Sequence, residues 1–171
     1  MSFILGIEKV SDNPDLQTFS EFVTGNFDRK AMGALDMSDF MVISGLMNRI
    51  FIIDVVPDGD RRLLFRYSGT TLDEQYGKNL MGRYFEDFFL GSNREMVIGN
   101  LYDAIDTGKA AYLRQHLYID AKKEKYRLAE RLAFPVAKNG NEVEQLIGIV
   151  TFSPGSTDGA DVCELFELPS S

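Results

Sequence analysis

The chain has 171 residues, which suits one domain of ordinary size with short extensions. Hydrophobic residues make up 44% of it, enough for a substantial core, and acidic residues exceed basic ones to give a net charge of −8. This balance argues against binding to nucleic acid or to an acidic membrane surface, because recognition of phosphate groups needs a basic face. A structural zinc site needs about four ligands of the His and Cys type. With one histidine and one cysteine, we expect no metal.

The cysteine count also bears on the compartment. A lone Cys163 cannot form an internal disulfide, which fits a reducing environment. The N-terminus lacks a basic leader, and no run of about 18 apolar residues could span a membrane. We therefore expect a cytoplasmic protein with no membrane attachment.

The first predicted helix begins near Pro14, where Asn13 can cap the first turn. A second helical stretch is expected to end near Met47. An apolar face on the first helix can cover the sheet of its own chain, pack across a homodimer, or do both. The candidates for this dimer interface are Leu16, Phe19, Phe22 and Val23.

A change of pattern follows the helical part. Residues 49–56 and 62–68 are β-branched and aromatic and flank a Pro-Asp-Gly turn, which predicts an antiparallel hairpin. Two helices are expected next, with an aromatic-rich connector between them. Three further strands are predicted, at 111–119, 126–136 and 144–152.

This order predicts an α+β domain with one antiparallel sheet and helices packed on it. We divide the chain into three parts. Residues 1–48 form an N-terminal helical extension, residues 49–154 form the core, and residues 155–171 form a linker and an acidic, apolar tail.

Three stretches of the core resemble PAS domains. They are FRYSGT at 65–70, the connector YGKNLMG at 76–82, and ERLAFPV at 130–136. From about Phe19 to Phe152 their order and spacing resemble a family of small bacterial single-PAS proteins without assigned biochemistry, although prolines expected near 35–47 are absent. The resemblance implies a PAS-like five-stranded antiparallel sheet of order 2-1-5-4-3 with helices on one face.

PAS domains are sensory and interaction modules, so the resemblance also implies a function. We expect a module without its own output domain or catalytic activity, which signals through an unidentified protein partner. Flavin photoreceptors of this superfamily need a cysteine where Leu80 stands, and haem-binding members use an axial histidine on the long helix, whereas His116 is on a predicted strand. We expect neither cofactor, and an unknown small-molecule ligand between sheet and helices stays open.

Aromatic side chains could line such a ligand cavity, or they could be ordinary core. Strand alternation places Phe65 and Tyr67 on one face, so this pair is expected to meet a ligand first. The full set of aromatic candidates is Phe65, Tyr67, Phe85, Phe88, Phe89 and Tyr102.

Glu130 is the main polar candidate. Alternation places it on an apolar face, expected to be the one covered by helices, with Leu128, Leu132 and Phe134. A carboxylate there needs hydrogen bonds or an ion pair. It is either a ligand anchor or part of a salt bridge to Arg66 or Arg114. Arg131 is expected to point to the opposite face, toward the N-terminal helix or solvent.

A second class of function remains open. The chain could be a small enzyme or carrier with an α+β cavity, isomerase-like, with Glu130 or an aspartate as base and Tyr67 or Tyr102 as proton donor. No pattern of nucleophile, base or metal ligands in the sequence favours it. A pair of Cys163 and His116 would have to form in space, because the two residues are far apart in the sequence.

Overall fold

The computed structural model describes residues 6–27, 38–57, 59–87, 92–120, 125–137, 142–154 and 161–168. Its helices are α1 (Pro14–Phe27), α2 (Thr70–Tyr76) and α3 (Ser92–Thr107), with the 3-10 segments η1 (Ile7–Lys9), η2 (Asp39–Arg49) and η3 (Phe85–Asp87). Its strands are β1 (Ile50–Val56), β2 (Arg62–Ser68), β3 (Ala110–Asp120), β4 (Lys125–Val136), β5 (Gln145–Pro154) and β6 (Val162–Phe166).

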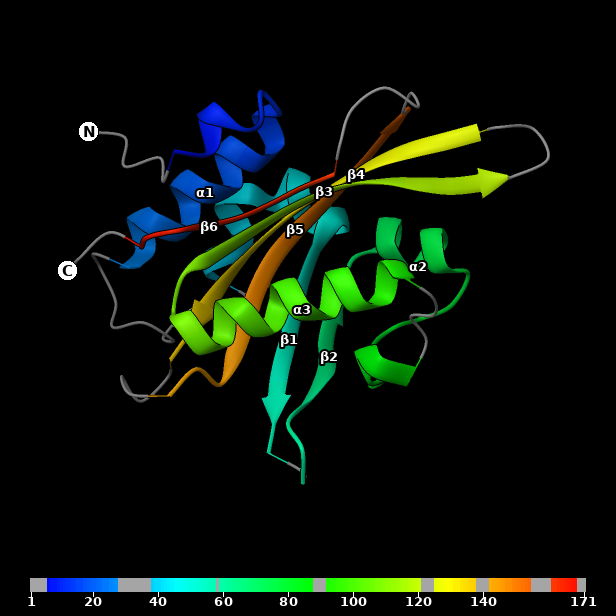
Figure 1. The fold of residues 1–171 in the computed structure, drawn as a ribbon. Helices are drawn as coiled ribbons and strands as arrows, with labels where there is room; N and C mark the ends of the chain where they lie inside the picture. Colours follow the sequence, from blue (N-terminus) through cyan, green and yellow to red (C-terminus); the bar gives the residue numbers. More distant parts are fainter. Residues whose placement is uncertain are drawn as a thin grey trace.

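The strands form one antiparallel sheet of order β2-β1-β5-β4-β3-β6 (Figure 1). The predicted order 2-1-5-4-3 is therefore present, but the prediction of five strands is wrong for the described residues. The tail contributes β6, which pairs with β3. Val162 and Phe166 pack partly against the apolar core, and the strand covers backbone groups that would otherwise be exposed at the edge of the sheet.

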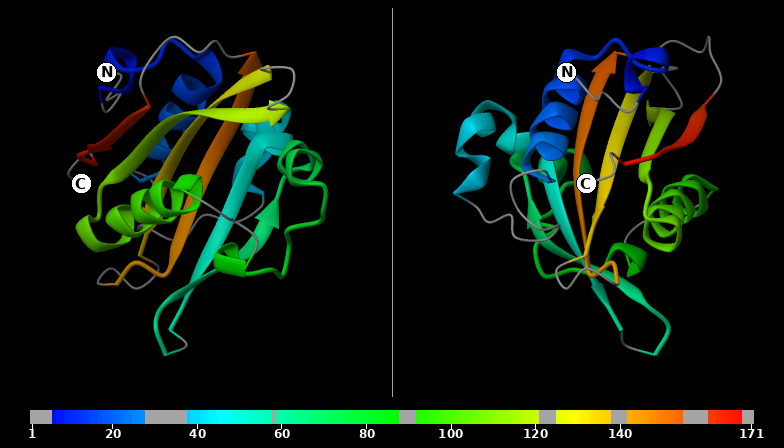
Figure 2. Two further views of the ribbon diagram at one scale, coloured as in Figure 1. Left: turned by 45° about the vertical axis from the view of Figure 1, so that its right-hand side comes forward. Right: turned by 90° about the vertical axis from the view of Figure 1, so that its left-hand side faces the viewer.

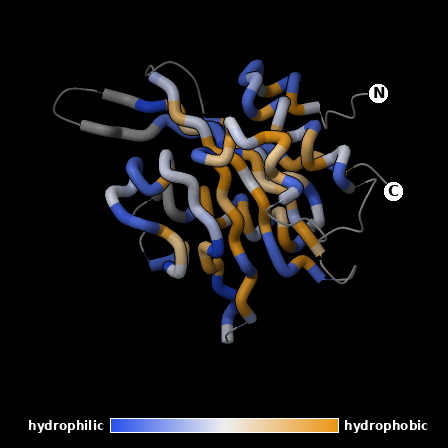
Figure 3. The backbone as a smooth tube through the Cα atoms, turned by 180° about the vertical axis from the view of Figure 1, so that it is seen from behind, coloured by the Kyte–Doolittle hydropathy of each residue, from blue (hydrophilic) through white to orange (hydrophobic). Residues whose placement is uncertain are grey.

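Helical segments cover both faces of the sheet, so the prediction of one covered face is also wrong (Figure 2). Segments α1 and η2 lie on one face, and α2, η3 and α3 lie on the other. The physical reason is that consecutive strand residues such as Ile52 and Ile53 are both buried, one on each face. Figure 3 shows hydrophobic residues concentrated along the sheet between these two layers.

The N-terminal helix begins as predicted. Its first turn is capped by Asn13, whose side-chain oxygen accepts a hydrogen bond from the backbone N–H of Asp15 at 3.0 Å. The rings of Phe19 and Phe134 of β4 pack edge to face, with ring centroids 5.9 Å apart. Among the described segments, no helix is long and apolar enough to cross a membrane.

Gly69 lies where β2 passes into α2. Its φ of −68° is accessible to any residue, so its backbone conformation does not require glycine. A side chain at this position would instead collide with the backbone of Met47 and Asn48 at the end of η2. Close packing of two backbone segments therefore explains the glycine in the FRYSGT stretch.

Candidate functional site

Glu130 and Arg131 are consecutive residues on β4, a strand with β5 on one side and β3 on the other. Both are buried, with 8% and 5% of their surfaces exposed. Because neighbouring strand residues point to opposite faces, Glu130 lies on the α1 side and Arg131 on the side of α2 and α3. Arg131 points to the face opposite Glu130, as predicted, but α2 and α3 cover that face, and not the N-terminal helix or solvent. Glu130 is covered by the N-terminal helical part rather than by α2 and α3.

A small cavity lies between the sheet and helices α2 and α3. Its volume is about 10 Å³, room for one particle of the size of a water molecule. Phe65 and Phe85 form part of its wall, and their rings stack with centroids 5.5 Å apart. The described residues that line it are Phe51, Phe65, Leu72, Tyr76, Phe85, Val97, Leu101 and Arg131.

Arg131 is the charged residue of this cavity. Its Nη1 donates to Oε1 of Gln115 on β3 at 2.9 Å, and its Nη2 donates to the hydroxyl of Tyr76 on α2 at 2.8 Å. The Gln115 amide in turn lies 3.5 Å from the sulfur of Met96 on α3. Within the described parts of the chain, Arg131 forms no ion pair with a carboxylate. Its positive charge therefore has neutral hydrogen-bond partners there.

Glu130 is also held by neutral groups. Ser11 Oγ donates to it at 2.7 Å, Asn13 Nδ2 at 2.9 Å and the Tyr112 hydroxyl at 2.8 Å. Burial, followed by the hydrogen bond to Glu130, raises the pKa of Tyr112 above its ordinary value. Three donors on one carboxylate make this side of the strand a closed network.

The predicted salt bridge of Glu130 does not form. Arg66 instead pairs with Asp54, with 2.6 Å between Nε and Oδ2. Arg114 reaches the backbone oxygen of Val10 at 3.5 Å. The buried carboxylate of Glu130 is therefore stabilised by hydrogen bonds and not by an ion pair.

A β-bulge separates Phe65 from Tyr67. The pairing of β1 with β2 shifts between Ile52 and Ile53, so that Arg66 is an extra residue in β2. Phe65 then lies in the core under α2 and α3, while Tyr67 packs on the α1 side. The prediction that the two rings share a face is wrong, because strict alternation fails at the bulge.

The other aromatic candidates are distributed unevenly. Phe85 lines the cavity with Phe65, as predicted for a shared pocket. Tyr67 donates its hydroxyl to the backbone oxygen of Met47 at 3.0 Å, away from the cavity. The predictions for Phe88 and Phe89 fall outside the described residues.

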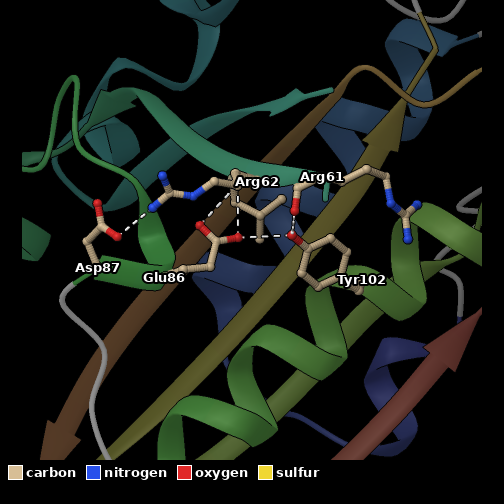
Figure 4. Close-up of polar contacts among 6 residues, drawn as sticks. Arg61, Arg62, Glu86, Asp87 and Tyr102 are labelled. Atoms are coloured by element: carbon tan, nitrogen blue, oxygen red, sulfur yellow. Dashed lines mark hydrogen bonds and ion pairs between the residues drawn. The ribbon is translucent and has the colours of Figure 1, made fainter. Parts of the chain in front are cut away.

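Tyr102 on α3 belongs to a charged cluster outside the cavity (Figure 4). Its hydroxyl lies 2.9 Å from Glu86 and 2.5 Å from the backbone oxygen of Arg61. Glu86 also accepts the backbone N–H of Leu63 at 3.0 Å, and Arg62 pairs with Asp87 at 2.5 Å. The cluster joins η3 and α3 to the start of β2, so Tyr102 holds the framework together rather than facing a ligand.

Burial, and then the hydrogen bond to Glu86, raises the pKa of Tyr102 to about 12. The phenol therefore keeps its proton at neutral pH. A wider open groove of about 800 Å³ lies beside this cluster. Its arginines are paired with carboxylates on its own walls, Arg61 with Asp106 and Arg66 with Asp54.

The dimer candidates of α1 are part of the core of their own chain. Their exposed fractions lie between 0% and 9%, and they pack with residues of β4 and β5. This face is therefore not available to a second chain while α1 stays on the sheet. The four residues are Leu16, Phe19, Phe22 and Val23.

The cofactor positions can be located as well. Leu80 is buried in the core under α2 and α3, and the cavity there is far smaller than the roughly 300–1,000 Å³ of pockets for molecules of drug size. His116 lies on β3, where Asp161 accepts its backbone N–H at 3.0 Å.

Cys163 and His116 do not form a dyad. Cys163 pairs with Leu113 across the two strands, so the two side chains share a face. His116 is three residues along from Leu113 and lies on the opposite face. Among the described residues, no group of three or more His, Cys, Asp or Glu side chains is placed to hold a metal ion.

Sequence reasoning missed the three residues that give the cavity its polar character: Tyr76, Gln115 and Arg131. The alternation of β4 correctly separates Glu130 from Arg131, but both faces of the strand are apolar. The pattern therefore could not indicate which of the two charges α2 and α3 would cover. The sequence held one signal for this site. Because both faces of β4 are apolar, both should be buried, so an arginine on either face should be buried as well.

No protein-family model and no curated protein matches the chain. Among solved structures, it is similar to an RNA-binding light-oxygen-voltage receptor, with a TM-score of 0.44 and 16% sequence identity. The match covers 71% of this chain and 35% of that one, so the chain spans about a third of the receptor's length. The strand order and the helices between β2 and β3 give the core a PAS-like topology.

Proposed function

We propose that the chain is a PAS-type sensory or protein-interaction module of the cytoplasm, which acts through a partner protein and not by catalysis. The observation that supports this function is the position of Arg131. It lies in a cavity enclosed by the sheet and by the helices inserted between β2 and β3. In a PAS-like topology, this is the place where a bound molecule can be detected.

The contacts of Arg131 suggest how occupancy of the cavity would be transmitted. The guanidinium is hydrogen-bonded to Tyr76 on α2 and to Gln115 on β3. Gln115 contacts Met96 on α3, which is 38% exposed. A ligand that draws the guanidinium toward itself would alter these contacts and shift the two helices, whose outer surfaces a partner could bind.

The alternative of a small isomerase-like enzyme or carrier has less support. Its proposed base, Glu130, lies on the α1 side and already accepts three hydrogen bonds. Its proposed donors, Tyr67 and Tyr102, are bonded to framework groups elsewhere. No described arrangement brings a base and a donor together in one cavity.

The partner can be tested in the native host. The full chain carrying an affinity tag is expected to co-purify with one protein in every replicate, and that protein should bind the purified chain with defined stoichiometry in calorimetry. A tag-only strain is the control. If no protein is recovered reproducibly, the proposed function fails. Native mass spectrometry of the same preparation reports whether the chain is a dimer and whether it carries a small molecule.

A further inference from the structure

We propose that the cavity under α2 and α3 is a binding site for a small monovalent anion, held by the guanidinium of Arg131. The ligand class is a halide ion or the carboxylate of a very small acid such as formate. The biological role of the site rests on the proposed sensory function, whereas binding of the anion does not.

The buried positive charge of Arg131 favours an anionic ligand. An arginine stays protonated at all ordinary pH values, so the site carries a full positive charge at 5% exposure. Buried charges in proteins are normally paired, because desolvation of an unpaired charge is strongly unfavourable. The described residues offer Gln115 and Tyr76, both neutral. Glu130 is next in sequence but lies across the sheet, with its own donors.

The cavity beside Arg131 is small and mainly apolar. The space open to the centre of a water-sized particle is only about 10 Å³, which excludes sulfate, phosphate and larger organic acids and favours a single ion or a carboxylate of very few atoms. The walls are mainly aromatic and aliphatic, including Phe65 and Leu101. In such low-dielectric surroundings, the attraction between a guanidinium and an anion is much stronger than in water. One positive charge also matches one negative charge.

Thermal unfolding of the full chain tests the proposal. Potassium chloride, bromide or formate would replace potassium gluconate, whose anion is too large for the cavity, at constant ionic strength. An anion present at about 100 times its Kd is expected to raise Tm by about 5–10 °C. A response to formate alone identifies a carboxylate site, and a response to the halides identifies an inorganic one. No response to any of the three overturns the proposal.

Arg131→Gln removes the charge and keeps a polar group, and it should abolish the response. Arg127→Gln is the matched control. Arg127 lies on the same strand and also donates to a neutral side chain of α2, Gln75 at 2.8 Å, but it is exposed. It should keep the full response. An equal response in Arg131→Gln and the wild type would refute the site.

A second measurement covers the case in which Arg131→Gln does not fold. Crystals of the wild-type chain soaked in bromide should show an anomalous-scattering peak beside the Arg131 guanidinium, and added formate should reduce it. Electron density for the cavity with no bromide peak would contradict a halide site. If the bromide peak is missing and formate also fails to raise Tm, the proposal is wrong. These measurements use the purified chain and do not depend on whether a partner protein is found. The anion site and the proposed function can therefore fail independently.

Discussion

The two faces of the sheet bury opposite charges of two consecutive residues, and the surroundings of these charges differ. On the α1 face, the carboxylate of Glu130 accepts hydrogen bonds from Ser11, Asn13 and Tyr112. On the other face, the guanidinium of Arg131 has neutral acceptors and borders a cavity. One charge is held by three hydrogen-bond donors, and the other has a space beside it, which we propose an anion occupies.

On the α1 face, the buried charge of Glu130 connects a helix to the sheet. Ser11 and Asn13 immediately precede α1, so their bonds to Glu130 attach the start of that helix to β4. Asn13 also donates to Thr151 of β5 at 2.8 Å, which ties the same residue to a second strand. The network therefore joins the start of α1 to both β4 and β5.

Removal of the carboxylate is the largest expected perturbation. Glu130→Ala removes the acceptor of two buried donors, Ser11 and Tyr112, and one of the two acceptors of the half-buried Asn13. It should lower the free energy of unfolding by about 3–5 kcal/mol. Urea denaturation followed by circular dichroism measures the change. Because α1 depends on these bonds, we expect the N-terminal segment to become sensitive to protease before the rest of the chain.

Two variants separate this effect from the loss of a charge alone. Glu130→Gln keeps an acceptor oxygen and should cost about 1–3 kcal/mol, less than the alanine variant. Glu164→Ala removes an exposed carboxylate from β6 and should change stability by less than about 0.5 kcal/mol. A loss of similar size in Glu130→Ala and Glu164→Ala would show that the network contributes nothing.

The cavity face can be perturbed without touching a charge. Gly148 of β5 lies opposite Phe51, whose ring occupies the space where a side chain at 148 would be. Gly148→Ala should push this ring toward the cavity and cost about 1–3 kcal/mol. It should also weaken the stabilisation by small anions, since Phe51 is part of the lining.

Gly25→Ala on α1 is the matched control for this variant, because nothing lies within 4 Å of a side chain built there. A glycine in a helix interior is unfavourable by about 1 kcal/mol relative to alanine, so this change should stabilise the chain slightly. If Gly148→Ala lowers stability but leaves the anion response intact, the cavity is not where the anion binds.

Much of the fold could be predicted from local patterns, and the errors have identifiable physical causes. The hairpin and the three later strands follow from β-branched and aromatic runs, and the helix at Pro14 follows from its cap. The bulge at Arg66 could not be predicted, because one extra residue in β2 leaves no mark in the hydrophobic pattern. It moved Tyr67 away from the cavity.

The strand β6 and the position of Arg131 were missed for another reason. Five residues at the sheet edge, with Cys163 and Glu164 exposed, give too short a pattern to distinguish a strand from a tail. For β4, both faces are apolar, so alternation predicts two opposite faces without saying which helices cover each. That information lies in the packing of the whole chain.

The tyrosines that donate to carboxylates offer the smallest and most local test. Tyr102 has its pKa raised to about 12 in the folded chain, against an ordinary value of 10, chiefly by burial and then by its bond to Glu86. The folded state holds this proton more tightly than the unfolded state does. Its contribution to stability is therefore complete below pH 10 and is lost as the pH rises to about 12.

Ultraviolet titration of the wild type minus Tyr102→Phe isolates this phenol and should give a midpoint of about 12. Glu86→Gln removes the negative charge beside the hydroxyl, so the midpoint should fall toward 10. The buried phenol of Tyr112, which donates to Glu130, should respond in the same direction to Glu130→Gln. If Glu86→Gln leaves the titration midpoint of Tyr102 unchanged, burial alone raises the pKa of this phenol. If Glu130→Gln nevertheless lowers the midpoint of Tyr112, the carboxylates on the two faces of the sheet differ in their effect on the neighbouring tyrosine.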